Sequence, residues 1–171
     1  LSPLTGSIEI KDWNESEDSK VEFITLNDGK TIYIGSTVFN IMTDVTEDFS
    51  GTNGRDFING RGGDDILRPG DGDDVVFGGE GADVIYLSGT WGGGSNRAFG
   101  GSGNDRIHAE ISTSSQYIDG GDGDDGIYGG VAGDVLIGGE GNDTILGSVS
   151  LFGTSPDGDN VMFGGVGDDF V

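Results

Sequence analysis

Large apolar residues recur with a spacing of nine through most of this chain. Each stands two positions after an aspartate or amide that ends a glycine-rich turn. Residues 78–86 read GGEGADVIY and residues 138–146 read GGEGNDTIL. Both follow the pattern G-G-x-G-x-D-x-U-x, in which U is a large aliphatic residue. Self-similarity at a fixed period is the signature of a repeat fold. The pattern therefore predicts stacked units, each made of a turn and a short strand.

Twelve such units align from Gly51 onward, nine of them without an insertion. The U position is apolar in every unit, which a random sequence would not maintain. These residues are Ile58, Leu67, Val76, Ile85, Ala98, Ile107, Ile118, Ile127, Leu136, Ile145, Met162 and Val171. They are the predicted interior of an all-β repeat domain that spans residues 51–171.

Residues 1–50 contain few glycines and show the alternation typical of strands. One strand is predicted at 7–11. Two more, at 21–26 and 31–34, flank the turn sequence NDGK at 27–30, which favours a hairpin. We therefore expect residues 1–50 to form a small β cap beside the repeat domain.

Consecutive units must lie on opposite sides if each is a turn followed by a strand, so two units make one coil of eighteen residues. The turns then form two edges. The regular edge has turns ending in Asp65, Asp83, Asp105, Asp125, Asp143 and Asp169. The interrupted edge has turns ending in Asp56, Asp74, Asn96, Gln116, Asp134 and Asn160. Insertions at 87–90, 109–110 and 147–154 precede the three turns that end in an amide. We expect the regular edge to bind metal at every gap and the interrupted edge to bind it more weakly.

The turns offer the ligands that calcium prefers. Glycine takes positive φ at little cost, which lets main-chain carbonyls turn inward. Calcium takes 6–8 oxygen ligands and accepts carbonyls and carboxylates together, so two neighbouring turns can complete one shell. The aliphatic interior is sparse, glycine is costly to order and the acidic turns repel one another. We therefore expect the chain to be largely unfolded without calcium and compact with it.

The sequence GGDGDD at 120–125 and its equivalents resemble the nonapeptide repeats of RTX proteins, which are calcium-binding toxins, adhesins and hydrolases exported by bacterial type I secretion. The resemblance implies a right-handed parallel β-roll with calcium ions between adjacent turns, held by turn carbonyls and by the sixth-position aspartate. On the regular edge the implied ligands are Gly60, Gly62, Asp65, Gly78, Gly79, Glu80, Gly81, Asp83, Gly100, Gly101, Ser102, Gly103, Asp105, Gly120, Gly121, Asp122, Gly123, Asp125, Gly138, Gly139, Glu140, Gly141, Asp143, Gly164, Gly165, Gly167 and Asp169. On the interrupted edge they are Asp56, Gly72, Asp74, Gly129, Val131 and Asp134. Five gaps on each edge predict five to ten ions.

Composition excludes several other classes of function. The net charge is −23, from 31 acidic and 8 basic residues, which makes nucleic acid a poor partner. The absence of cysteine excludes disulfides and thiolate metal sites. No apolar run approaches the roughly 20 residues of a membrane span. No H-E-x-x-H or G-x-S-x-G motif occurs, and His108 is expected to face solvent. We therefore expect no enzymatic activity in this chain.

The predicted function is that of a calcium-binding RTX module whose folding is triggered by extracellular calcium after type I secretion. The chain begins without methionine and stops inside a repeat, so we expect a fragment of a larger secreted or surface-bound bacterial toxin or adhesin, with the rest of that polypeptide as a partner. One alternative is a solenoid that recognises a host glycan or receptor through the loops at 87–91 or 147–154. Another is an accessory module of a secreted enzyme.

Overall fold

The computed structural model describes residues 23–25, 31–33, 38–87, 93–147 and 158–171. The chain divides into two compact units, Leu1–Ser36 and Thr37–Val171. In the first unit, β1 (Phe23–Thr25) pairs antiparallel with β2 (Thr31–Tyr33), with Ile24 opposite Ile32. This pairing is the one expected for a hairpin around residues 27–30. The strand predicted at 7–11 lies outside the described residues.

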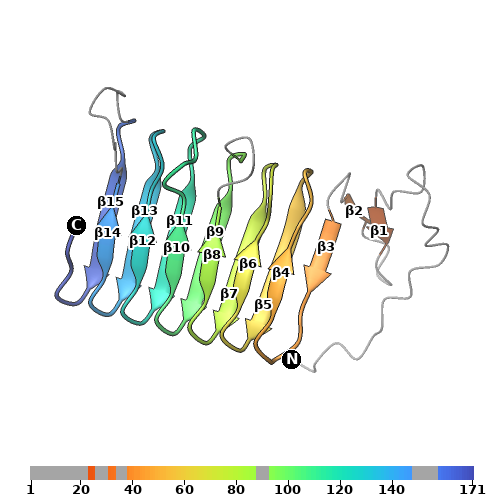
Figure 1. Cartoon of the computed structure of the whole chain (residues 1–171), viewed down its shortest axis with the longest axis horizontal. Coiled ribbons are helices and arrows are strands. Elements are labelled where there is room, and N and C mark those ends of the chain that lie inside the picture. Colours follow the sequence, from red (N-terminus) through yellow and green to blue (C-terminus); the bar gives the residue numbers. More distant parts are fainter. Residues whose placement is uncertain (1–22, 26–30, 34–37, 88–92, 148–157) are drawn as a thin grey trace. The chain divides into compact units, whose positions relative to one another are not determined.

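The second unit is a parallel β-solenoid, or β-roll, built from two sheets whose strands alternate along the chain (Figure 1). The seven-stranded sheet contains β3 (Val38–Ile41), β5 (Asp56–Gly62), β7 (Val75–Glu80), β9 (Arg97–Ser102), β11 (Tyr117–Asp122), β13 (Val135–Glu140) and β15 (Val161–Val166). The six-stranded sheet contains β4 (Asp48–Ser50), β6 (Ile66–Arg68), β8 (Val84–Tyr86), β10 (Arg106–His108), β12 (Gly126–Tyr128) and β14 (Thr144–Leu146). The expected parallel β-roll is therefore confirmed.

The pairing between coils follows the predicted repeat and its insertions. Ile58 lies opposite Val76, eighteen residues on, as the two-unit coil requires. The spacing becomes 22 residues between the coils of Asp74 and Asn96, and 20 between those of Asn96 and Gln116. It becomes 26 where β13 pairs with β15. The strands on either side of each insertion therefore keep the same inward-facing position.

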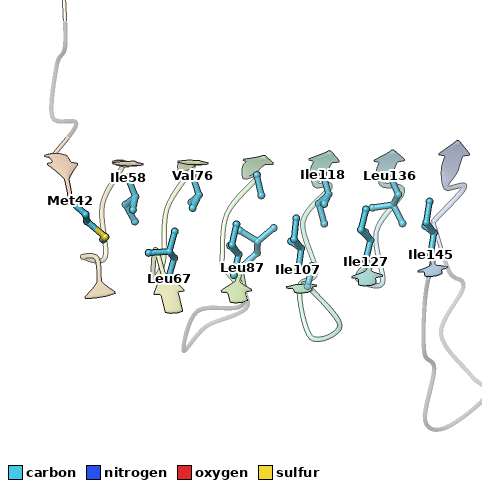
Figure 2. Close-up of a cluster of buried hydrophobic side chains, with 13 residues drawn as sticks. Met42, Ile58, Leu67, Val76, Leu87, Ile107, Ile118, Ile127, Leu136 and Ile145 are labelled. Carbon is cyan, nitrogen blue, oxygen red and sulfur yellow. The ribbon is translucent and has the colours of Figure 1, made fainter. Parts of the chain in front are cut away.

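One residue of each short strand points into the narrow space between the two sheets (Figure 2). The predicted interior residues from Ile58 to Ile145 are all at most 1% exposed. Met42, Leu87 and Ala109 add to this core, and Phe49 packs against it. Met162 and Val171 were predicted to be interior but are 37% and 54% exposed, because among the described residues their coil pairs on one side only.

The outward faces of both sheets carry stacked aromatic rings. On the seven-stranded sheet Phe77 and Phe99 lie directly opposite each other, with ring centroids 4.8 Å apart. On the six-stranded sheet the ring of His108 stacks between Tyr86 and Tyr128, at 5.1 and 4.9 Å. Because equivalent positions in successive coils lie side by side, a parallel solenoid places like residues in contact along its axis.

The roll begins earlier than the change in composition near residue 50. In β3, Asn40 lies opposite Ile58, and in β4, Phe49 lies opposite Leu67. The boundary between the compact units falls between Ser36 and Thr37, whereas the sequence analysis placed it after residue 50. Strand pairing and an inward-facing side chain suffice to form a coil, so the first coil does not need the glycine-rich turns that mark the later ones.

Replacing Ile107 by alanine should lower the stability of the roll in millimolar calcium by about 2–5 kcal/mol, because it opens a cavity in a core that is one side chain wide. Ile111→Ala is the matched control, since Ile111 is 67% exposed and its truncation should cost less than about 0.5 kcal/mol. Urea unfolding followed by circular dichroism measures both. Equal losses would contradict the assignment of Ile107 to the interior.

Candidate calcium sites between the turns

The regular edge consists of short turns that connect each strand of the seven-stranded sheet to the next strand of the six-stranded sheet. These turns lie along the bottom of the view in Figure 1, and the described turns of the interrupted edge lie along the top. The aspartates that end the regular turns from Asp65 to Asp143 are at most 3% exposed. The fold therefore places a row of buried carboxylates along one edge, one for each coil.

One oxygen of each carboxylate ties its coil to the preceding one. The amide of Asp83 donates to Asp105 Oδ1 at 2.7 Å, and the amide of Asp105 donates to Asp125 Oδ1 at 2.8 Å. Further members of this ladder are Asp65 to Asp83, Asp125 to Asp143 and Asp143 to Asp169. The ladder fixes each carboxylate and occupies its Oδ1 atom.

The other oxygen of these carboxylates has no hydrogen-bond donor. This holds for the buried Oδ2 atoms of Asp65, Asp83, Asp105, Asp125 and Asp143. Buried polar atoms in proteins are nearly always satisfied, and leaving one without a partner costs about 1–3 kcal/mol, more if it is charged. A regular row of such atoms indicates that a partner other than the protein itself completes them.

Each partnerless oxygen faces a main-chain carbonyl of the next coil. A Cβ atom added to Gly78 would lie 2.3 Å from Asp83 Oδ2 and 2.5 Å from the carbonyl oxygen of Gly100. Gly60, Gly100, Gly120 and Gly138 show the same arrangement. Two oxygens from adjacent coils thus converge on the space beside the first glycine of every gap, where a side chain would intrude.

The second and fourth positions of the turns need glycine for a different reason. Gly79 and Gly81 have φ values of 120° and 124°, which L side chains rarely adopt. A Cβ atom at either would also lie within 2.3 Å of a carbonyl oxygen of the preceding turn. Glycine therefore lets adjacent turns stack closely enough for their oxygens to share one cation.

The remaining predicted ligands of the regular edge lie in these same stacked turns. The third-position residues Glu80, Ser102, Asp122 and Glu140 have exposed side chains. Their carbonyls accept hydrogen bonds from the amides of Gly63, Gly81, Gly103 and Gly123, at 2.6–2.9 Å. One lone pair of each carbonyl is therefore used between coils, and the second remains for a cation.

The interrupted edge satisfies most of its carboxylates internally. Asp56 Oδ2 accepts from Thr52 N at 2.9 Å and from Thr52 Oγ1 at 2.8 Å. Asp134 Oδ2 accepts from Gly130 N at 2.8 Å. Only Asp74, among the described carboxylates of this edge, has a buried Oδ2 without a donor. The predicted carbonyl ligands Gly72, Gly129 and Val131 lie in these turns. The positive φ of the second and fourth positions is kept at Gly70 and Gly72 but is absent from the turns at 51–56 and 129–134, so the two edges differ in backbone shape as well as in what completes their carboxylates.

The regular edge has one further member that the repeat pattern did not identify. Glu47 N donates to Asp65 Oδ1 at 2.8 Å, so Glu47 occupies the aspartate position of the first coil. Its own carboxylate accepts from Thr43 N and Thr43 Oγ1 at 3.0 and 2.9 Å. An acidic residue eighteen positions before Asp65, with threonine four residues earlier, was the available signal.

Burial makes the charged form of these aspartates unfavourable when no cation is bound. It raises the pKa of Asp105 and Asp125 to about 7 and that of Asp74 and Asp83 to about 6. Neighbouring carboxylates raise these pKa values further, and the backbone hydrogen bond to Oδ1 opposes the shift. A divalent cation between the turns would offset the cost of burying the charged carboxylates and the repulsion between them.

The donor set fits calcium better than a transition metal. No three His, Cys, Asp or Glu side chains converge on a point in the part of the chain that the structure describes. Ligands must therefore be mainly carbonyl oxygens with one carboxylate from each turn. Hard cations with high coordination numbers accept such oxygen sets, whereas zinc sites use nitrogen and sulfur side chains.

Without calcium, lowering the pH from 7.5 to 5 should increase the β-sheet content of the chain. The raised pKa values mean that folded aspartates bind protons more tightly than unfolded ones, so stability falls as the pH rises between about 4 and 7. Circular dichroism in chelator measures this. Asp125→Asn should weaken the pH dependence, and a roll that instead loses structure on acidification would contradict the assignment.

A comparison with protein families agrees with this geometry. The model of the RTX calcium-binding nonapeptide repeat matches residues 44–76, 70–89, 92–111, 128–149 and 157–171, which together make up more than half of the chain. No curated protein and no solved structure matches the chain. Between the matched segments, β11 and β12 pair with the coils on both sides, so the repeat architecture is continuous there. The chain belongs to the family of RTX calcium-binding nonapeptide repeats, as its sequence pattern predicted.

Proposed function

We propose that this calcium-binding module is a folding switch that becomes ordered outside the cell, after type I secretion, as part of a larger bacterial toxin or adhesin. The observation that carries the proposal is the row of buried Oδ2 atoms without donors along the regular edge. A fold that buries these oxygens unpaired is unfavourable, and the same fold with calcium in the gaps is not.

The calcium concentration would determine which state is populated. Extracellular calcium modules bind with dissociation constants of about 10⁻⁴–10⁻³ M. The calcium concentration in the cytosol is too low to fill such sites, whereas the concentration outside the cell is high enough. Each ion bound to the folded state alone adds about 1.4 kcal/mol for every tenfold excess over its dissociation constant. Several weak sites acting on one cooperative roll would therefore keep the chain unfolded during export and fold it afterwards.

Extracellular location and a larger parent protein rest on the RTX repeats themselves. Among the described residues, no helix is long and apolar enough to cross a membrane. The loops considered for glycan recognition, with Trp91, lie mostly outside the described residues. Recognition of a host glycan or receptor therefore stays a prediction from the sequence.

A non-catalytic role is also part of the proposal. The single histidine, His108, has both faces of its ring covered by Tyr86 and Tyr128, and its Nδ1 lies 2.8 Å from Glu110 Oε1. These contacts support a packing role on the outer face of the six-stranded sheet. The buried aspartates use Oδ1 in the ladder between coils and present Oδ2 to the proposed cations, which argues against general acid or base catalysis.

The folding switch predicts a largely unfolded spectrum in chelator and a cooperative gain of parallel β structure in millimolar calcium. Circular dichroism over a calcium titration from about 10⁻⁶ to 10⁻² M measures it. Magnesium at the same concentrations is the control, because its small octahedral shell suits these large oxygen cages poorly. An identical spectrum with and without calcium would rule out the switch.

Asp125→Asn should have opposite effects with and without calcium. It removes a buried charge, so more β structure should remain in chelator, and it removes the anionic ligand, so the folded protein should bind about one ion fewer. Equilibrium dialysis with metal analysis measures the number of bound calcium ions. Asp122→Asn makes the same chemical change in the same turn at an exposed side chain, and should do neither. Equal behaviour of the two variants would contradict the assigned ligand.

A further inference from the structure

The gap between the turns that end in Asn96 and Gln116 is built differently from every gap of the regular edge. We propose that the side-chain amides of these two residues close this gap in place of a calcium ion. The inference rests on the proposed binding of calcium elsewhere in the roll, and it identifies a gap that the roll completes from its own atoms.

Gln116 combines both functions that a carboxylate and its cation perform elsewhere. Its Oε1 accepts from Asn96 N at 3.1 Å, which continues the ladder between coils. Its Nε2 lies 2.8 Å from the carbonyl oxygen of Gly94, 2.8 Å from Ser112 Oγ and 2.7 Å from the carbonyl oxygen of Ser114. Gly94 belongs to the preceding turn, so the amide nitrogen joins oxygens from two adjacent turns.

This cluster of oxygens around a positively polarised group is the arrangement that a cation would create. An amide nitrogen carries two hydrogens, so two of the three oxygens are bonded at a time. Gln116 is 3% exposed, and its amide therefore works in a water-poor site where such hydrogen bonds are worth most. No net charge is buried, so no ion has to be desolvated.

Asn96 brings no carboxylate to this gap. Its Oδ1 accepts from Asp74 N at 2.8 Å, which continues the ladder to the preceding turn, as an aspartate would. Its Nδ2 takes the place of the partnerless Oδ2 of the regular edge and donates to the carbonyl oxygen of Leu87 at 3.2 Å. Neither amide thus has an oxygen left that needs a metal.

The turn that follows the short insertion supplies two of the three acceptors, Ser112 Oγ and Ser114 O. The amide of Ser112 donates to the carbonyl oxygen of Ala109 at 2.8 Å, which folds the inserted residues back on the coil. Ser112 is fully buried there and presents its hydroxyl to the Gln116 amide. The insertion places Ser112 where the Gln116 amide can reach it, which explains why the insertion and the amide occur together in this turn.

Gln116→Glu tests the proposal, because it replaces Nε2 by an oxygen without changing the shape of the side chain. Four oxygens would then meet in the gap, and the variant should bind one calcium ion more per chain than the wild type. Its folding should also require more calcium, by roughly twofold at the midpoint, since this gap would no longer close by itself. Equilibrium dialysis with metal analysis gives the ion count, and circular dichroism gives the midpoint.

Asn96→Asp is the second variant, for the case in which Gln116→Glu does not fold at saturating calcium. It should also gain one ion, whereas the reverse change on the regular edge, Asp105→Asn, should lose one. If the wild type binds calcium but neither Gln116→Glu nor Asn96→Asp gains an ion, the inference is overturned and the proposed switch is untouched. If the wild type binds no calcium at all, the proposed function itself fails.

Discussion

The structure depends on the different roles of the two oxygens of one aspartate carboxylate. In the regular turns from Asp65 to Asp143, one aspartate oxygen accepts the amide of the acidic residue in the preceding coil, and the other lies buried without a donor, facing a carbonyl of the following coil. The first oxygen makes the coils stack in one order and at one separation. The second makes that stack unfavourable unless a cation is present. In the proposed folding switch, the same residue therefore specifies the fold and makes it conditional on calcium.

The shape of the interior explains why such a condition is needed. The two sheets enclose one aliphatic side chain per strand, so the core is long but narrow, as the row of side chains in Figure 2 shows. Burial of apolar surface is the main force in folding, and a core of this kind supplies less of it per residue than a globular domain does. Glycine at the turns adds a large entropic cost. Stacked rings on the outer faces, such as Phe77 on Phe99, recover part of the difference through contacts between equivalent positions.

The two edges show two ways of completing the same turn. On the regular edge the missing group is a cation. On the interrupted edge, except at Asp74, it is a donor from the chain itself: the Thr52 amide and hydroxyl for Asp56, the Gly130 amide for Asp134, and the glutamine amide in the gap described above. Thr43 does the same for Glu47 in the first coil. Local donors make a turn independent of the ion, so a roll can combine coils that respond to calcium with coils that hold their shape without it.

The nine-residue spacing was sufficient to predict stacked units of turn and strand, the two edges and nearly every core residue, because a parallel solenoid places equivalent positions side by side and a single period describes them all. The resemblance to RTX repeats added the parallel β-roll. Residues outside that period were not predictable in this way. The first coil, with Phe49 and Glu47, lacks the glycine-rich turns and is defined only by its pairing with the next coil. The sequence named Asp56, Asp134 and Asp125 all as ligands, with weaker binding expected on the interrupted edge, but it did not show how each carboxylate is completed. Only the tertiary structure separates them, because a carboxylate oxygen needs a cation only if no donor of the folded chain reaches it, and which donors reach it is decided by the packing of neighbouring turns.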